Sequence, residues 1–364
     1  MTRLRVILLA VVLVAGLVLC GLWLKRGELA VALMSKIYAH AMGADPIKAL
    51  PDGLSVGLCG SGSPMPDPTR AGPCTVVVAG RQVFVIDSGT GSTKNLSLMN
   101  LPPAAVSAVF LTHFHSDHIA DLGELLLQHW ASGAAKQPLP VYGPTGVDKV
   151  LEGFETAYAL DRGYRIAHHG PTVVPPSGFG GEAHAFAVDK TAPDVKLIDT
   201  PDLKVYAVPV DHGVVDAAVG YVFLYKGRKV VISGDTKASP RLEAAAKGAD
   251  VLVHEGLAPN LVAAQREAAI NGGRTNLAAI FHDILTYHTT PEQAAGIAER
   301  AHVRMLLFTH VIPPLPFKAL NGPFLGKARE IFHGKIRVGR DGDFVTLPPG
   351  GTEIRRTNRL KVFF

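Results

Sequence analysis

Cysteine is scarce in this chain of 364 residues, which contains only three. No two of them have the C-x-x-C spacing of a thiolate zinc site, so we do not expect the cysteines to bind metal. Cys20 lies within a long apolar run, which leaves Cys59 and Cys74. These two can form a disulfide in an oxidising compartment, and a pair of small buried thiols is the alternative that the sequence leaves open.

Long stretches of one charge sign are also absent. The formal net charge is +5, and basic groups such as Arg355-Arg356 and Arg359 are short. The sequence has no extended Lys/Arg stripe of the kind that marks a nucleic-acid surface. It also has no internal repeat and no low-complexity tract, and its 48% of hydrophobic residues suits an extensive core.

The one long hydrophobic run stands at the N-terminus. Arg3 and Arg5 precede residues 6–24, a run of 19 residues without a charge. A run of this length can cross a hydrocarbon core as a helix. A cleaved signal peptide is the alternative, but no A-x-A cleavage site follows the run, which favours an uncleaved anchor. Because a short basic tail usually stays in the cytoplasm, we expect a single-pass inner-membrane protein with a periplasmic catalytic domain.

The remainder is long enough for one large domain. We divide the sequence into a signal anchor (1–28), a juxtamembrane helix and linker (29–52) and a hydrolase domain (53–364). Residues 161–200 show little periodicity. A long irregular segment in a compact domain is usually functional or mobile, so this stretch is interpreted as a lid insertion.

Four side chains that can bind metal follow one predicted buried strand. They are His113, His115, Asp117 and His118, and they come directly after the apolar run 108–111. Neutral imidazole and carboxylate are ligands suited to zinc and neighbouring transition metals. A buried cluster of titratable groups without a cation would be costly, so the sequence predicts a metal site here.

Three more candidate ligands follow later apolar strands. His212 follows the β-rich run 203–210, Asp235 follows 229–233, and His310 follows 305–309. Strands alternate with helical segments in the second half of the chain. Two β-rich halves with helices between them predict an α/β protein, an αββα sandwich.

The H-x-H-x-D-H segment and the three later ligands resemble the metallo-β-lactamase superfamily, from about Leu54 to His310. Within it the chain is most similar to the branch that contains tRNase Z and arylsulfatase-like hydrolases. The segments that carry this likeness are Gly60–Pro64, Gly220–Phe223, His254-Glu255 and Tyr287–Thr289. The resemblance implies an αββα metallo-β-lactamase sandwich, here preceded by the N-terminal transmembrane helix.

The resemblance also implies two divalent metal ions, zinc by preference, with Mn²⁺ or Fe²⁺ as alternatives. One ion would be held by His113, His115 and His212. The second would be held by Asp117, His118 and His310, and Asp235 would bridge the two. A bridging carboxylate offsets the repulsion between two cations that share a water.

Three residues are candidates for catalysis. Asp117 can accept a hydrogen bond from the nucleophilic water. His288 is interpreted as a proton donor to the leaving group, with a merely structural loop histidine as the alternative. Glu255 is expected to orient His288 or a metal ligand through a hydrogen bond.

These features lead us to expect a membrane-anchored di-metal hydrolase that cleaves a small anionic ester with a metal-bridging hydroxide. The ester would be a phosphodiester or an aryl sulfate or phosphate. A tRNase Z-like endoribonuclease that processes tRNA 3′ ends is the main alternative, followed by a lactonase or β-lactamase and by a non-catalytic membrane scaffold. The sequence leaves a homodimer open.

Nucleic acid is not the expected partner, because the segment that corresponds to the tRNA-docking arm is net acidic. Residues 161–200 contain four basic and five acidic side chains. Phosphate contacts supply most of the affinity for nucleic acid, so an acidic arm would bind tRNA poorly.

Overall fold

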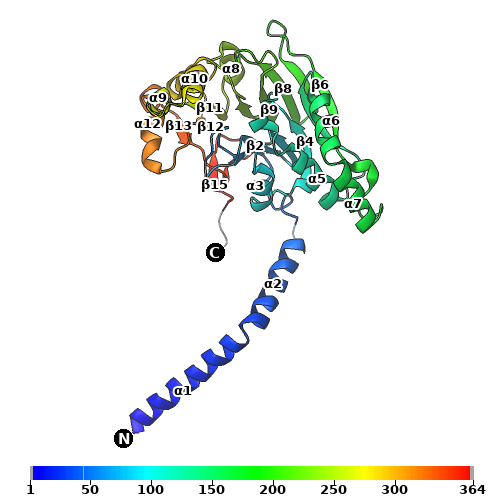
Figure 1. Cartoon of the computed structure of the whole chain (residues 1–364), viewed down its shortest axis with the longest axis vertical. Helices are drawn as coiled ribbons and strands as arrows, with labels where there is room; N and C mark the ends of the chain where they lie inside the picture. Colours follow the sequence, from blue (N-terminus) through cyan, green and yellow to red (C-terminus); the bar gives the residue numbers. More distant parts are fainter. Residues whose placement is uncertain (1–2, 44, 361–364) are drawn as a thin grey trace. The chain divides into compact units, whose positions relative to one another are not determined.

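The computed structural model describes residues 3–43 and 45–360 and divides the chain into two units, 1–50 and 51–364 (Figure 1). The first unit consists of helix α1 (Arg3–Leu24) and helix α2 (Arg26–Gly43). Helix α1 buries none of its side chains and is long and apolar enough to cross a membrane. A signal sequence passes the same test of length and composition, so this helix is weak evidence for an anchor.

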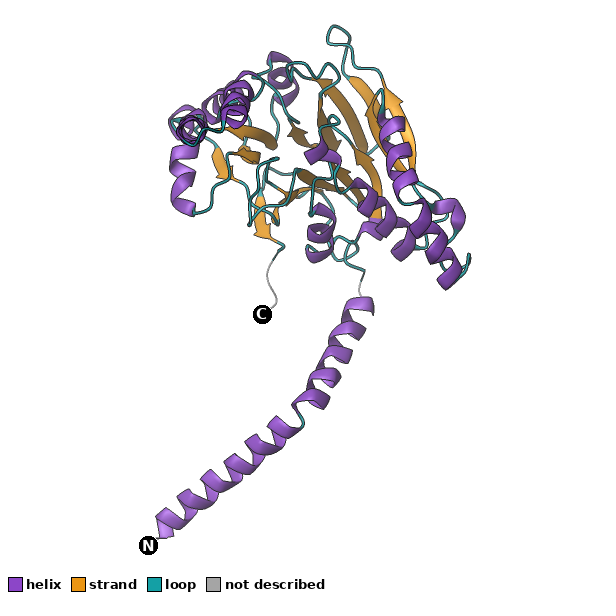
Figure 2. Ribbon diagram, in the orientation of Figure 1, coloured by secondary structure: helices purple, strands orange, loops and turns teal. Residues whose placement is uncertain are grey.

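The second unit is built on two β-sheets (Figure 2). The first sheet has the order β15-β14-β1-β2-β3-β4-β5-β6, and the second has the order β13-β12-β11-β10-β9-β8-β7. The strands of the first sheet are β1 (Leu54–Gly60), β2 (Cys74–Ala79), β3 (Gln82–Ile86), β4 (Val106–Phe110), β5 (Leu139–Pro144), β6 (Gly181–Phe186), β14 (Asp343–Leu347) and β15 (Arg355–Asn358). Those of the second are β7 (Val195–Asp199), β8 (Leu203–Pro209), β9 (Val219–Tyr225), β10 (Arg228–Ile232), β11 (Val251–Leu257), β12 (Met305–Ile312) and β13 (Lys335–Val338).

The main core lies between the two sheets. The Phe110 ring of the first sheet lies 5.4 Å from the ring of Tyr221 and 5.6 Å from that of Phe223, both in the second sheet. Strands such as β1 and β11 are buried along their whole length. Strands covered on both faces read as continuous apolar runs, which is why the sequence predicts them well.

Helices cover the outer faces of both sheets (Figure 2). They are α3 (Ser92–Leu98), α4 (Ser116–Ile119), α5 (Leu122–Gly133), α6 (Val147–Ala157), α7 (Ala159–His169), α8 (Pro240–Ala246), α9 (Pro259–Asn271), α10 (Thr275–Asp283), α11 (Pro291–Arg300), α12 (Asn321–Leu325) and α13 (Ala328–Ile331). Leu242 of α8, Ile297 of α11 and Phe324 of α12 pack with the outer face of the second sheet in one buried cluster. The predicted αββα arrangement of the α/β domain is confirmed.

The structure differs from the sequence prediction in two segments. Residues 161–200 are not irregular, because they contain most of α7 and the strands β6 and β7, each at the edge of a sheet. An edge strand with one neighbour is half-exposed and lacks a clear apolar pattern, which explains the error. The sequence also missed β13, β14 and β15, of which β14 and β15 return to the first sheet beside β1.

Parallel pairing positions the functional side chains. Strands β10, β11, β12 and β13 are parallel neighbours in the second sheet, and β3, β4 and β5 are parallel neighbours in the first. The carboxyl ends of parallel strands meet at one edge of a sheet, where ligands usually bind. Of the seven predicted metal ligands, His310 lies within the last three residues of β12, and the other six lie in the segments that follow β4, β8 and β10, with Asp117 and His118 in α4.

Candidate metal centre

A buried carboxylate holds the turn after β4 in place. Asp87 accepts hydrogen bonds from the backbone N–H and the hydroxyl of Thr112, both at 2.8 Å. It also lies 2.8 Å from Nδ1 of His118. With Nδ1 engaged, Nε2 of His118 is left to face the site. The sequence analysis did not single out Asp87, although its place directly after an apolar strand is a signal for a special role, and the structure adds a positive φ of 59°.

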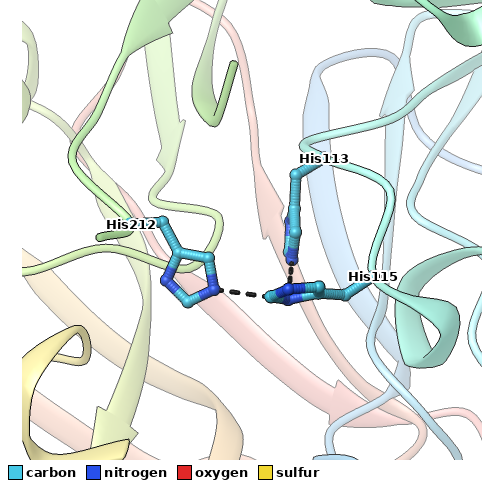
Figure 3. A group of neighbouring side chains, drawn as sticks. All are labelled: His113, His115 and His212. Carbon is cyan, nitrogen blue, oxygen red and sulfur yellow. Dashed lines mark hydrogen bonds between the residues drawn. The ribbon is translucent and has the colours of Figure 1, made fainter. Parts of the chain in front are cut away.

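The first donor group is formed by His113, His115 and His212 (Figure 3). Nε2 of His113 and Nε2 of His212 lie 3.0 and 3.4 Å from Nδ1 of His115. Nδ1 of His212 donates to the backbone carbonyl of Tyr287 at 3.0 Å, which leaves Nε2 as the free lone pair. Burial lowers the pKa of His212 and holds that of His113 well below its usual value, so both rings are neutral, the form that binds metal.

The second donor group is formed by Asp117, His118 and His310, and it meets the first group at Asp235. Oδ2 of Asp235 lies 3.3 Å from Nε2 of His118 and 3.2 Å from Nε2 of His310. The same oxygen lies 3.9 Å from Nε2 of His212, a member of the first group. Asp235 is therefore the one carboxylate of the predicted set that contacts both groups.

The charges of this centre are mutually dependent. Burial opposes ionisation of Asp235, but His310 and His118 outweigh it and hold its pKa well below the usual value. Burial likewise opposes the charge on His118, but Asp235 and Asp87 outweigh it and raise its pKa well above the usual value. A cation placed between these groups would take over the role of the His118 proton.

The donor set fits divalent metal ions. Nε2 of His118 is buried and has no hydrogen-bond partner among the described residues, although it faces two carboxylates. A buried nitrogen without a partner is costly, and a metal ion removes that cost. Imidazoles and carboxylates at this spacing are zinc-type ligands.

The predicted catalytic pair Glu255 and His288 is in contact. Oε1 of Glu255 lies 3.0 Å from Nδ1 of His288 and accepts from the backbone N–H groups of Thr289 and Thr236, both at 3.1 Å. Thr236 follows Asp235 directly in the chain. Glu255 therefore holds both the His288 ring and the backbone next to Asp235 in place. Burial lowers the pKa of His288, but Glu255 outweighs it and the net effect is a raised pKa.

An open cavity of about 380 Å³ lies beside Asp117. Its walls come from the loop after β1, including Arg70, and from the start of α4. The Arg70 side chain is buried and donates to the hydroxyl of Ser61 and to the carbonyl of Gly339. Because Asp117 is one of its lining residues, we call this space the substrate cavity.

Cys59 and Cys74 form a disulfide between β1 and β2, with their Cα atoms 5.0 Å apart. The structure thus selects one of the two alternatives that the sequence left open. Cys74 also lines a small internal pocket together with Asp87, His118 and Asp235. The disulfide therefore links the end of β1, where the following loop begins, to a residue that lines the pocket beside the metal centre.

The fold and the donor set define a metal-dependent hydrolase, and comparison with known proteins agrees. The family model of the metallo-beta-lactamase superfamily matches residues 67–271. The chain is 35% identical over 298 residues to ribonuclease Z of Mycobacterium bovis, which covers 81% of this chain and 99% of that protein. It is 36% identical over 300 residues to ribonuclease Z of Mycolicibacterium gilvum, covering 82% and 97%. The chain belongs to the metallo-β-lactamase superfamily, in the branch of tRNase Z.

Solved structures agree on the fold. The short form of human tRNase Z has a TM-score of 0.57 and 22% identity, covering 81% of this chain and 99% of that one. The metallo-beta-lactamase fold protein YhfI of Bacillus subtilis also has a TM-score of 0.57, with 18% identity and coverage of 80% and 99%.

The relatives overturn the predicted substrate. A small anionic ester was expected because residues 161–200 are net acidic, but relatives about 35% identical over four fifths of the chain are ribonucleases Z. The expectation that nucleic acid is an unlikely partner conflicts with the same finding. A metal-dependent hydrolase also excludes the non-catalytic scaffold.

Proposed function

We propose that this chain is an endoribonuclease of the ribonuclease Z type, which hydrolyses a phosphodiester bond of RNA at a two-metal centre. The observation that carries the proposal is a full set of seven donor side chains in a chain that aligns with 99% of a ribonuclease Z. Fold alone does not fix function, so the site has to supply the chemistry.

In this proposal His113, His115 and His212 would hold one ion, and Asp117, His118 and His310 would hold the other, with Asp235 shared between the two donor groups. Zinc is the preferred metal, because imidazole and carboxylate are ligands that suit it. Two bound divalent ions would activate a water and polarise the phosphate. The remaining steps belong to side chains of the chain itself.

Asp117 accepts a hydrogen bond from the attacking water and faces the substrate cavity. His288 donates a proton to the departing ribose oxygen, which is a poor leaving group without one. The raised pKa of His288 favours the protonated form that this step needs. Glu255 is a positioning residue, because it fixes Nδ1 of His288 at 3.0 Å.

The test is cleavage of a precursor tRNA by the purified, metal-loaded full chain, with bis-p-nitrophenyl phosphate as a small diester for comparison. We expect endonucleolytic cleavage of the RNA with a higher kcat/KM than for the small diester. An enzyme that hydrolyses the small diester and leaves the RNA intact would contradict the proposal.

We also propose that α1 anchors the chain in a membrane, with residues 1–28 as the anchor, 29–52 as a juxtamembrane linker and 53–364 as the catalytic domain. An export orientation is supported by the disulfide between Cys59 and Cys74, because thiols stay reduced in the cytoplasm. The physiological RNA would then belong to the compartment outside the cytoplasm, and precursor tRNA serves as the assay substrate.

A further inference from the structure

Five cationic side chains surround one surface pocket near the C-terminal end of the second unit. They are Lys318, Arg329, Arg337, Arg340 and Arg356, and the pocket has a volume of about 330 Å³. No Asp or Glu lines it. We call this group the basic pocket, and it lies outside residues 67–271, which match the family model.

The positive charge of the basic pocket is largely uncompensated. Among the described residues, the structure shows an ion-pair partner for only one of the five cations: Arg337 contacts Asp343 at 2.6 Å. Lys318, Arg329 and Arg356 are exposed to solvent. Like charges gathered around one hollow repel each other, so the arrangement favours an anionic ligand.

Strand pairing brings the basic pocket to the same sheet edge as the metal centre. Strands β12 and β13 are parallel, with Phe308 opposite Val338. His310 lies two residues beyond Phe308, and Arg340 lies two residues beyond Val338. The paired strands β12 and β13 therefore carry both residues toward the same end of the second sheet, where the chain of β13 leaves the sheet at Arg340.

Arg70 connects the basic pocket with the substrate cavity. It lines the cavity that contains Asp117, and its guanidinium donates to the carbonyl of Gly339 at 2.7 Å, next to Arg340. Asp341 fixes the same junction, since its carboxylate accepts from the backbone N–H groups of Ser61 and Ala71. The hydrogen bond from Arg70 to Gly339 thus connects a residue that lines the substrate cavity with the backbone next to Arg340, which lines the basic pocket.

We propose that the basic pocket binds the phosphate backbone of the substrate RNA while the scissile phosphodiester occupies the metal centre. The inference rests on the proposed ribonuclease function. Arginine recognises phosphate through paired N–H donors, and phosphate contacts supply most of the affinity for nucleic acid. The C-terminal segment thereby supplies an RNA-docking surface that the net acidic residues 161–200 do not.

The test is the double substitution Lys318→Glu and Arg356→Glu in the full chain in detergent micelles. Neither residue belongs to the metal centre, and both are exposed, so folding and hydrolysis of bis-p-nitrophenyl phosphate should be unchanged. We expect the Kd for a precursor tRNA with a non-hydrolysable scissile linkage to rise at least about tenfold. The slope of log Kd against log salt should fall by about two, one for each lost phosphate contact.

The matched control is Lys136→Glu with Lys149→Glu, two exposed lysines that give the same change in charge. It should alter the Kd by less than about threefold. An unchanged Kd in the Lys318/Arg356 variant, or an equal loss in the control, would overturn the inference. So would an unchanged Kd together with a lost preference for phosphatidylglycerol over phosphatidylcholine vesicles, which would assign the pocket to a membrane surface.

Direct binding keeps the two proposals apart. Loss of RNA binding in the variant supports the basic pocket whether or not the wild type cleaves RNA. A wild type that binds precursor tRNA through this pocket, hydrolyses the small diester and leaves the RNA uncut would contradict the ribonuclease function alone.

Discussion

Asp235 and His118 carry opposite charges in an interior that would ordinarily keep each of them neutral. Burial disfavours both charges, and only their mutual contact at 3.3 Å and the neighbouring Asp87 and His310 reverse that effect. Burying such a cluster costs desolvation free energy, and removing any one member leaves a buried partner unpaired. At the scale of single residues, the site therefore acts as one coupled unit whose members cannot be replaced independently.

We predict that Asp235→Ala lowers the bound metal, because the substitution removes the carboxylate of the predicted ligand set that contacts both donor groups. Metal analysis of the reconstituted wild type should find about two equivalents per chain, a number that follows from the two donor groups. The variant should retain about one or fewer. The control is Asp148→Ala, an exposed aspartate in α6, which should keep the full metal content; equal content in both variants would refute the bridging role.

A second prediction concerns His288. His288→Ala should reduce cleavage of RNA by roughly 10²-fold or more, the usual contribution of a positioned proton donor. Hydrolysis of bis-p-nitrophenyl phosphate should fall much less, because nitrophenolate leaves without protonation.

The metal content of the His288 variant should be unchanged, which separates proton donation from metal binding. His282→Ala, an exposed histidine at the end of α10, is the matched control and should behave as the wild type. Equal losses for the two substrates would favour a structural role for His288.

At the scale of elements, the C-terminal strands connect the two sheets to the site. Strand β14 pairs with β1, β13 pairs with β12, and the turn between β13 and β14 carries Arg340 and Asp341. The loop after β1 is held from two sides, by Asp341 and by the disulfide at Cys59. This loop forms one wall of the substrate cavity, so its order determines access to the metal centre.

We predict that Cys59→Ala with Cys74→Ala lowers the free energy of unfolding by about 3 kcal/mol, the value that loop-closure entropy gives for a loop of this length. The two cysteines are 15 residues apart. Denaturant titration of the variant and of the reduced wild type should show the same loss. Cys20→Ala should leave the unfolding curve of the catalytic domain in place, and a comparable loss there would contradict the assignment of the effect to the disulfide.

The whole molecule combines a helix suited to a membrane with a catalytic domain that contains a disulfide. The helix is suited to a membrane by its length and composition. The disulfide is of the kind that persists in an oxidising compartment. Both features agree with export of the catalytic domain.

We predict that alkaline phosphatase fused after residue 364 is active in cells, because that reporter folds only after export. The fusion should fractionate with membranes, and deletion of residues 3–24 should abolish both properties. Green fluorescent protein at the same position gives the opposite readout. Fluorescence with no phosphatase activity would place the domain in the cytoplasm, and a mature N-terminus near residue 25 would identify a cleaved signal peptide.

The sequence by itself determined the fold class, the apolar N-terminal run and the identity of the candidate ligands. Buried strands are continuous apolar runs, and each ligand stands directly after one of them, so local pattern was sufficient. His113 and His115 are two residues apart on an extended segment, and their proximity also followed from spacing alone.

Only the tertiary structure decided what comes together across long separations. The contacts of Asp87 with His118, of Glu255 with His288 and of Arg70 with Gly339 join segments 31, 33 and 269 residues apart. The short edge strands also could not be recognised in the sequence, because a strand with one neighbour is only partly buried and shows no clear apolar periodicity. The basic pocket is also a feature that only the tertiary structure shows. Its five cations are spread over residues 318–356 and form no basic run in the sequence. They come together where β13 and β15, the edge strands of the two sheets, lie.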